Sequence, residues 1–143
     1  MLTEIFILCL LGYLCGSIPF GVLLAKTRNM DIREHGSGNI GATNVARTMG
    51  KKAGLVTLTG DLLKGLLVVF AANQWFENTM ITALAGLSVF LGHLYSIFLK
   101  FKGGKGVATG LGLLSFTMPL STLCSAGVFT VCLKISGYVS LSS

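Results

Sequence analysis

Residues 5–25, IFILCLLGYLCGSIPFGVLLA, contain no charged side chain. A helix that crosses a membrane needs about 20 mainly apolar residues to span a hydrocarbon core about 30 Å thick, and this stretch is long enough. Backbone N–H and C=O groups must be paired within hydrocarbon, so a segment that crosses it has to be a helix. The stretch therefore predicts an all-α integral membrane protein whose first transmembrane helix covers residues 5–25.

The rest of the sequence has the same apolar character. The chain has 143 residues, of which 52% are hydrophobic and 11% are charged, whereas about 25% of the residues of a soluble domain are charged. Three more stretches have the length and composition of membrane helices. We therefore expect a multi-pass helical bundle in one transmembrane domain, 1–143, with helices at about 5–25, 53–72, 79–99 and 112–133, and the start of a fifth from Ile135.

The distribution of Lys and Arg predicts the orientation of the bundle. Of the 11 basic residues, all but Lys64 and Lys134 lie in the segments 26–52 and 100–111. Cytoplasmic loops carry the excess of Lys and Arg, so both segments are expected in the cytoplasm and the N-terminus outside. The leader before the first helix has no Lys or Arg, which favours a retained helix over a cleaved signal peptide. The net charge of +6 then follows the topology, and no nucleic-acid partner is expected.

The first basic loop contains a glycine pattern typical of nucleotide-binding proteins. Residues 35–52, HGSGNIGATNVARTMGKK, hold Gly36-x-Gly38-x-x-Gly41, and Asp61 follows about 20 residues later, as in a dinucleotide-binding fold. However, RNMDIREH before the first glycine is too polar for a buried strand, and LVTLTGD before Asp61 continues into an apolar helix. The pattern therefore does not predict a dinucleotide site.

The second basic loop fails the test for an ATP-binding loop. Gly104-Lys105 is followed by Gly106, where a Ser or Thr would be needed to hold magnesium. The cysteines form no CxxC pair and have no cluster of His around them. No cofactor and no metal are predicted.

Both basic loops nevertheless have residues suited to binding oxyanions. Small residues allow backbone N–H groups to approach an anion, and a helix N-terminus favours negative charge. If a short helix starts near Gly41, one helical face carries Ile40, Thr43, Asn44 and Arg47. Hydroxyl, amide and guanidinium groups on that face can bind one phosphate. The loop FKGGKGVATG offers a second set in Lys102, Lys105 and the glycines around them.

Three motifs together resemble a known family. GSGNIGATNVARTMGKKAG from Gly36, DLLKG from Asp61 and GHLYSIFLKFKGGKGVATGLG from Gly92 are similar, in order and spacing, to the bacterial acyl-phosphate:glycerol-3-phosphate acyltransferases. GSIPFGVLLAK, which ends at Lys26, is similar to the first helix of that family. The resemblance implies transfer of a fatty acyl group from acyl phosphate to glycerol 3-phosphate, giving lysophosphatidic acid and phosphate in phospholipid synthesis.

The resemblance also implies a location and partners. The enzyme is expected in the bacterial cytoplasmic membrane, with its active-site loops on the cytoplasmic side. The expected partners are glycerol 3-phosphate, acyl phosphate and membrane lipid, and the soluble enzyme that makes acyl phosphate is a further candidate.

The chemistry expected of such a site does not require a protein base. The pairing of a His with an Asp five residues later is absent, because Ile40 follows His35 and Phe98 follows His93 at that spacing. Acyl phosphate is already activated, so the protein has to position the hydroxyl and stabilise charge. The resemblance implies that a phosphate oxygen of a substrate accepts the hydroxyl proton.

The resemblance implies roles for particular residues. Catalytic contacts are expected from Ser37, Arg47 and Lys105. Substrate binding is expected from Gly36, Gly38, Asn39, Gly41, Thr43, Asn44, Lys64, His93, Gly103, Gly104 and Gly106.

Two features of the chain leave alternatives open. Asp61 and Lys64 share one face of an apolar helix, and they form either a self-compensating structural pair or a support for the site. The family is expected to have seven helices and a third motif with His, Asn and Glu residues, which has no counterpart before Ser143. The alternatives to an acyltransferase are a transporter or channel for a phosphorylated solute and an inactive, truncated relative with a structural role.

Overall fold

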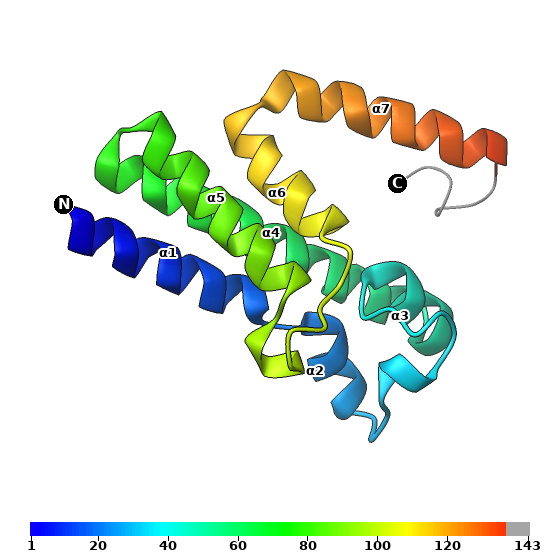
Figure 1. The fold of residues 1–143 in the computed structure, drawn as a ribbon. Helices are drawn as coiled ribbons and strands as arrows, with labels where there is room; N and C mark the ends of the chain where they lie inside the picture. The colour runs from blue at the N-terminus through cyan, green and yellow to red at the C-terminus, as the bar shows by residue number, and fades with distance from the viewer. Residues whose placement is uncertain (137–143) are drawn as a thin grey trace.

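The computed structural model describes residues 1–136, and every regular element in that part of the chain is helical (Figure 1). The helices are α1 (Leu2–Ser17), α2 (Phe20–Lys26), η1 (Ile32–Glu34), α3 (Ala42–Met49), α4 (Lys51–Phe76), α5 (Thr79–Leu94), η2 (Ile97–Leu99), α6 (Val107–Thr117) and α7 (Pro119–Ser136). The predicted all-α architecture is therefore confirmed.

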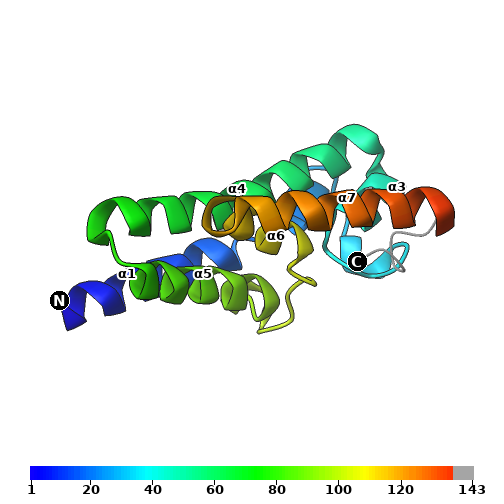
Figure 2. The ribbon, with the colours of Figure 1, turned by 90° about the horizontal axis from the view of Figure 1, so that it is seen from above.

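Three helices form the centre of the bundle. α1 packs along α5, and α4 packs against both α5 and α6, with α3 against the start of α4. Figures 1 and 2 show α1, α4 and α5 running side by side, while α7 follows α6 away from them. The segments between α2 and α3 and between α5 and α6 lie at one end of the bundle, opposite the N-terminus and the α4–α5 turn (Figure 1).

The first apolar stretch is not one straight helix over 5–25, as the sequence predicted. It divides into α1 and α2, which are bent by 43° relative to each other. Pro19 follows an extended Ile18 (φ −62°, ψ 114°) and precedes the first residue of α2. Proline lacks the N–H that would continue the helix, and it disfavours helical geometry at the residue before it. At the break, the carbonyl of Ile18 accepts a hydrogen bond from Lys64 of α4, and that of Ser17 accepts one from Ser96, between α5 and η2.

The predicted fourth helix, 112–133, is also wrong. α6 ends at Thr117, and α7 begins at Pro119 after a non-helical Met118 (φ −142°, ψ 64°). Pro119 cannot donate the backbone hydrogen bond that would join the two helices. α6 also starts at Val107, inside the segment 100–111 that was expected to be a loop. The expected start of a fifth helix lies mostly in 137–143, outside the described residues.

The second predicted helix, 53–72, is present as α4 and is longer at both ends, whereas the third, 79–99, is present as α5 but ends at Leu94, with the separate turn η2 after it. Among the described residues, α4 and the stretch Thr79–Leu99 are long and apolar enough to cross a membrane, and the bent pair α1–α2 makes a third span if it is counted as one.

Side chains are distributed as in a membrane protein. Leu55, Leu63 and Leu67 of α4 are exposed, while Asp61 and Lys64 of the same helix are 3% and 4% exposed. Apolar side chains on the outside suit lipid, and charges inside a bundle avoid it.

Glycines allow the central helices to approach closely. A Cβ on Gly16 of α1 would collide with the backbone of Val89 in α5, and one on Gly112 of α6 would collide with the carbonyl of Leu62 in α4. Such contacts between backbones are typical of helix packing in membranes. The hydrophobic effect does not drive helices together in lipid, so small residues that allow close van der Waals packing are favoured.

Candidate active site

The first glycine loop joins α2 to α3. Gly36 (φ +61°) and Gly38 (φ +71°) both have left-handed backbone conformations, which disfavour residues with a Cβ. A Cβ on Gly36 would in addition occupy the place of Asn44 Oδ1. The glycines therefore allow this loop to fold tightly around the side chain of Asn44.

Asn44 is 2% exposed, and its carboxamide is used entirely within the loop. Its Oδ1 accepts a hydrogen bond of 2.8 Å from the backbone N–H of Ser37. Its Nδ2 donates to the carbonyl oxygens of His35 (2.9 Å) and Asn39 (2.8 Å), with that of Ile32 at 3.3 Å. Both amide hydrogens are thus engaged within the loop. Asn44 therefore stabilises the shape of the loop, whereas the sequence had suggested that it donates a hydrogen bond to a phosphate.

The short helix predicted near Gly41 is present as α3. Asn39 Oδ1 accepts a hydrogen bond of 2.9 Å from the backbone N–H of Gly41, just before the helix begins. However, the four residues predicted to share one face of this helix do not share the same exposure. Thr43 and Arg47 are exposed one turn apart, whereas Ile40 and Asn44 are buried. Only Thr43 and Arg47 of that set remain accessible to a ligand.

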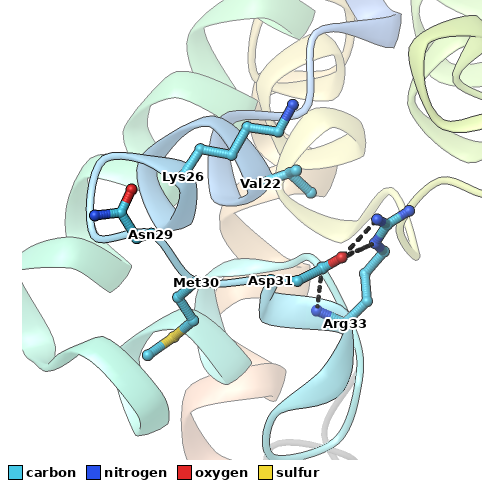
Figure 3. Close-up of a pocket in the computed structure, with 6 residues that line it drawn as sticks. All are labelled: Val22, Lys26, Asn29, Met30, Asp31 and Arg33. Atoms are coloured by element: carbon cyan, nitrogen blue, oxygen red, sulfur yellow. Dashed lines mark hydrogen bonds and ion pairs between the residues drawn. The ribbon is translucent and has the colours of Figure 1, made fainter.

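An ion pair occupies the start of the first loop. Arg33 Nη2 lies 2.6 Å from Asp31 Oδ2, beside a hollow of about 250 Å³ lined by Val22, Lys26, Asn29, Met30, Asp31 and Arg33 (Figure 3). Side-chain hydrogen bonds from Arg33, and then its backbone N–H, lower the pKa of Asp31 to about 2. The same pair raises the pKa of Arg33. Arg33 is therefore neutralised locally, whereas Arg47 has no recorded carboxylate partner among the described residues.

The second glycine loop follows η2 and is held by backbone hydrogen bonds. The N–H of Gly103 donates to Leu94 O (2.9 Å), and that of Gly104 donates to His93 O (3.1 Å). A Cβ on Gly104 would lie 3.3 Å from Cγ1 of Ile40 in the first loop. The two glycine loops therefore meet at Ile40 and Gly104, and Lys102 and Lys105 are both exposed beside this contact.

Most of the glycine N–H groups predicted to approach an anion are already used. The N–H of Gly38 donates to His35 O, and that of Gly41 donates to Asn39 Oδ1. The N–H groups of Gly103 and Gly104 donate to backbone carbonyls at the end of α5. These glycines serve conformation and close packing. The exposed side chains of the predicted set are Ser37, Thr43, Arg47 and Lys105.

Lys64 and His93 lie below the loops, inside the bundle. Lys64 Nζ donates a hydrogen bond to Ile18 O (2.9 Å). It also lies 2.8 Å from Asp61 Oδ1, as an ion pair whose angles do not meet those of a hydrogen bond. His93 Nδ1 lies 3.6 Å from the same Asp61 Oδ1 and 3.0 Å from Thr109 Oγ1. Thr109, which is fully buried, was not predicted as part of the site. Nothing in the spacing of VATG indicates that Thr109 faces a histidine on another helix.

The sequence model of the glycerol-3-phosphate acyltransferase family matches residues 6–143. The chain belongs to this family. Curated members named glycerol-3-phosphate acyltransferase include that of Geotalea daltonii, which is 51% identical over 99% of this chain and 73% of its own length. That of Geobacter sulfurreducens is 50% identical over 100% and 73%, and that of Bacillus subtilis is 49% identical over 96% and 71%.

Two solved structures have the same fold. Both are of PlsY, described as an integral membrane glycerol 3-phosphate acyltransferase, and both are 41% identical to this chain. The glycerol 3-phosphate form gives a TM-score of 0.93 over 97% of this chain and 70% of PlsY. The lysophosphatidic acid form gives 0.90 over 97% and 69%. The predicted family and its integral membrane fold are therefore confirmed.

Proposed function

We propose that the chain transfers a fatty acyl group from acyl phosphate to glycerol 3-phosphate, which yields lysophosphatidic acid and inorganic phosphate. The observation that carries this proposal is the TM-score of 0.93, at 41% identity, to an acyltransferase solved in its glycerol 3-phosphate form. The exposed Arg47, on the helix that follows the first loop, and Lys105, on the second loop, add the positive charge that two phosphorylated substrates require, and the two loops contact each other.

The proposed reaction is a direct displacement. A hydroxyl oxygen of glycerol 3-phosphate attacks the carbonyl carbon of acyl phosphate, and a new C–O ester bond forms. The bond between that carbon and the phosphate oxygen breaks, and phosphate leaves with the electron pair. The hydroxyl proton passes to a phosphate oxygen of a substrate. No covalent intermediate on the protein is needed, because phosphate is already a good leaving group.

The protein contributes position and charge to this displacement. Arg47 can bind a phosphate through two parallel N–H groups, and Thr43, one turn earlier on the exposed face of α3, can donate its hydroxyl to the same group. Ser37 presents its hydroxyl from the loop that Asn44 holds in shape. Lys105 supplies a mobile positive charge from the second loop.

We place both loops on the cytoplasmic side of the bacterial membrane and the N-terminus outside. All the Lys and Arg residues except Lys64 and Lys134 are in or next to these loops, and cytoplasmic loops carry such an excess. In this orientation the acyl tail of the substrate stays in the lipid while its phosphate reaches the loops. A soluble enzyme that makes acyl phosphate could deliver it from the same side.

The test uses the full chain, purified and inserted in lipid vesicles. Palmitoyl phosphate and radiolabelled glycerol 3-phosphate are added, and both labelled lysophosphatidic acid and free phosphate are measured. We expect the two products in equal amounts, with phosphate release that depends on glycerol 3-phosphate. Uptake of labelled glycerol 3-phosphate without ester formation would instead support the transporter, and neither product above empty vesicles would overturn the proposal.

A further inference from the structure

A chain of buried polar contacts crosses the bundle beneath the two glycine loops. It begins at the carbonyl of Ile18, where the first span is broken, and passes through Lys64 and Asp61 of α4 to His93 of α5. The three ionisable side chains of this chain are at most 5% exposed. Charges inside a membrane span are costly and are usually retained for a purpose, so the role of this chain needs an explanation.

His93 joins this chain to the second loop in three ways. Its Nδ1 lies 3.0 Å from Thr109 Oγ1, near the start of α6. Its backbone carbonyl accepts the hydrogen bond of Gly104. Its Nε2 lies where a Cβ on Gly104 would have to be. The residue therefore touches both ends of the segment that carries Lys105.

The other end of the chain reaches the first loop. After the break at Ile18 and Pro19, Gly21 of α2 packs so closely on the carbonyl of Ile40 that a Cβ would collide with it. Ile40 precedes α3, which carries Arg47, and its side chain also contacts Gly104. Lys64 thus holds the helix break that supports the first loop, while His93 holds the second loop.

We propose that His93, supported by Asp61 and Lys64, is a positioning residue that fixes the loop of Lys105 relative to α3, which carries Arg47. This inference rests on the proposed function. A buried ion pair adds little net stability over apolar residues of the same shape, but in some proteins buried polar contacts specify one arrangement of the elements that carry them. A displacement of about 1 Å in a site that works by orientation can lower the rate about 100-fold.

The first test distinguishes the roles of the two ring nitrogens of His93. The amide nitrogen of Asn can replace Nδ1, and that of Gln can replace Nε2. We expect His93→Ala and His93→Gln to lose about 100-fold in kcat/KM, and His93→Asn to stay within about fivefold of the wild type. Rescue by Gln but not by Asn would overturn the proposal in favour of direct contact between Nε2 and substrate. Reduced thermal stability with unchanged kcat and KM per folded protein would overturn it in favour of packing alone.

The second test avoids any change to the ionisable residues. Thr109→Val removes only the hydroxyl that faces His93, and Thr109→Ser restores it. Thr117→Val is the matched control, because within residues 1–136 the hydroxyl of Thr117 bonds only to Leu113 O of its own helix. We expect Thr109→Val to lower kcat/KM about tenfold, and Thr109→Ser and Thr117→Val to leave it near the wild-type value. Equal effects of the two valine variants would overturn the proposal.

A double variant tests whether the effect passes through Lys105. If Thr109 acts by placing Lys105, adding Thr109→Val to Lys105→Ala lowers kcat/KM no further. Full additivity of the two losses would overturn this route. Failure of the proposed function is distinguishable from all these outcomes, because the wild-type chain itself would then form no lysophosphatidic acid.

Discussion

The side-chain oxygen of Asn44 accepts a hydrogen bond of 2.8 Å from the backbone N–H of Ser37, seven residues earlier in the chain. The hydrogens on its amide nitrogen point to carbonyls of the same loop. One buried side chain thus pairs with the N–H of Ser37 and the carbonyl of Asn39, and it adds a second donor to the carbonyl of His35. The backbone conformation of the loop that presents Ser37 therefore depends on the hydrogen bonds of the Asn44 side chain.

Replacement of Asn44 tests this dependence. Asn44→Ala removes the side-chain partner of the Ser37 N–H and of the Asn39 carbonyl, both part-buried, and a buried group left without a partner costs about 1–3 kcal/mol. We expect a lower melting temperature in detergent and a loss of activity of at least about tenfold. Thr48→Ala is the control, because the Thr48 hydroxyl bonds mainly to the Asn44 carbonyl at 2.9 Å, within α3. A variant Asn44→Ala with wild-type stability would contradict the role of this side chain.

The first loop also shows what the sequence could and could not predict. The short helix that was assumed to start near Gly41 is present as α3. The division of its face was not predictable, since burial of Ile40 and Asn44 depends on which distant segments cover them. Asn44 was expected to contact phosphate because its side chain can donate hydrogen bonds. The path of the backbone, which no residue spacing reveals, decides where those hydrogen bonds go.

The exposed cations provide the second prediction. Arg47→Ala and Lys105→Ala remove the groups proposed to bind phosphate and to stabilise charge in the displacement, so each should lower kcat/KM at least about 100-fold. Lys134→Ala is the matched control, because it removes the same charge from an exposed position in α7. The measurement is formation of labelled lysophosphatidic acid in vesicles. Near-normal rates for either site variant would exclude that residue from the site.

The fold was predictable where hydropathy alone decides it. The apolar stretches of α4 and α5 are helical near the predicted positions, although α5 ends at Leu94 instead of Leu99, because a backbone that crosses hydrocarbon must pair its own polar groups. The breaks at Pro19 and Pro119 were missed, although both prolines stood inside the predicted helices. Hydropathy averaged over a window of residues takes no account of the backbone N–H that proline lacks. The proline rule, applied to the same sequence, would have found both boundaries.

Close packing of α6 on α4 gives the third prediction. Gly112→Ala places a Cβ against the carbonyl of Leu62, so the helices have to separate, at a cost of about 1–3 kcal/mol. We expect a lower melting temperature in detergent. Gly127→Ala is the control, because a Cβ there meets no atom of the described residues within 4 Å, and the change should be neutral or stabilising through helix propensity. If both variants melt like the wild type, the close contact of α6 with α4 is incorrect.

The ion pair between Asp31 and Arg33 gives the fourth prediction, which concerns pH. Hydrogen bonds from Arg33 hold the pKa of Asp31 at about 2, below its ordinary value of 3.8. A depressed carboxyl pKa contributes stability that is present above the unfolded pKa and is lost as the pH falls through the folded value. The loop should therefore keep this pair at every pH above about 4.

Carbon-13 NMR of labelled Asp31 in detergent micelles measures this directly. We expect a titration midpoint near the lowered value in the wild type and a return toward the ordinary value in Arg33→Ala, because the main cause of the shift is then gone. Arg28→Ala is the control, since Arg28 donates to Met49 O instead of a carboxylate. The pair is exposed, so its effect on overall stability should be small. An ordinary midpoint in the wild type would show that Arg33 is free, and it would then join Arg47 as a candidate for binding phosphate.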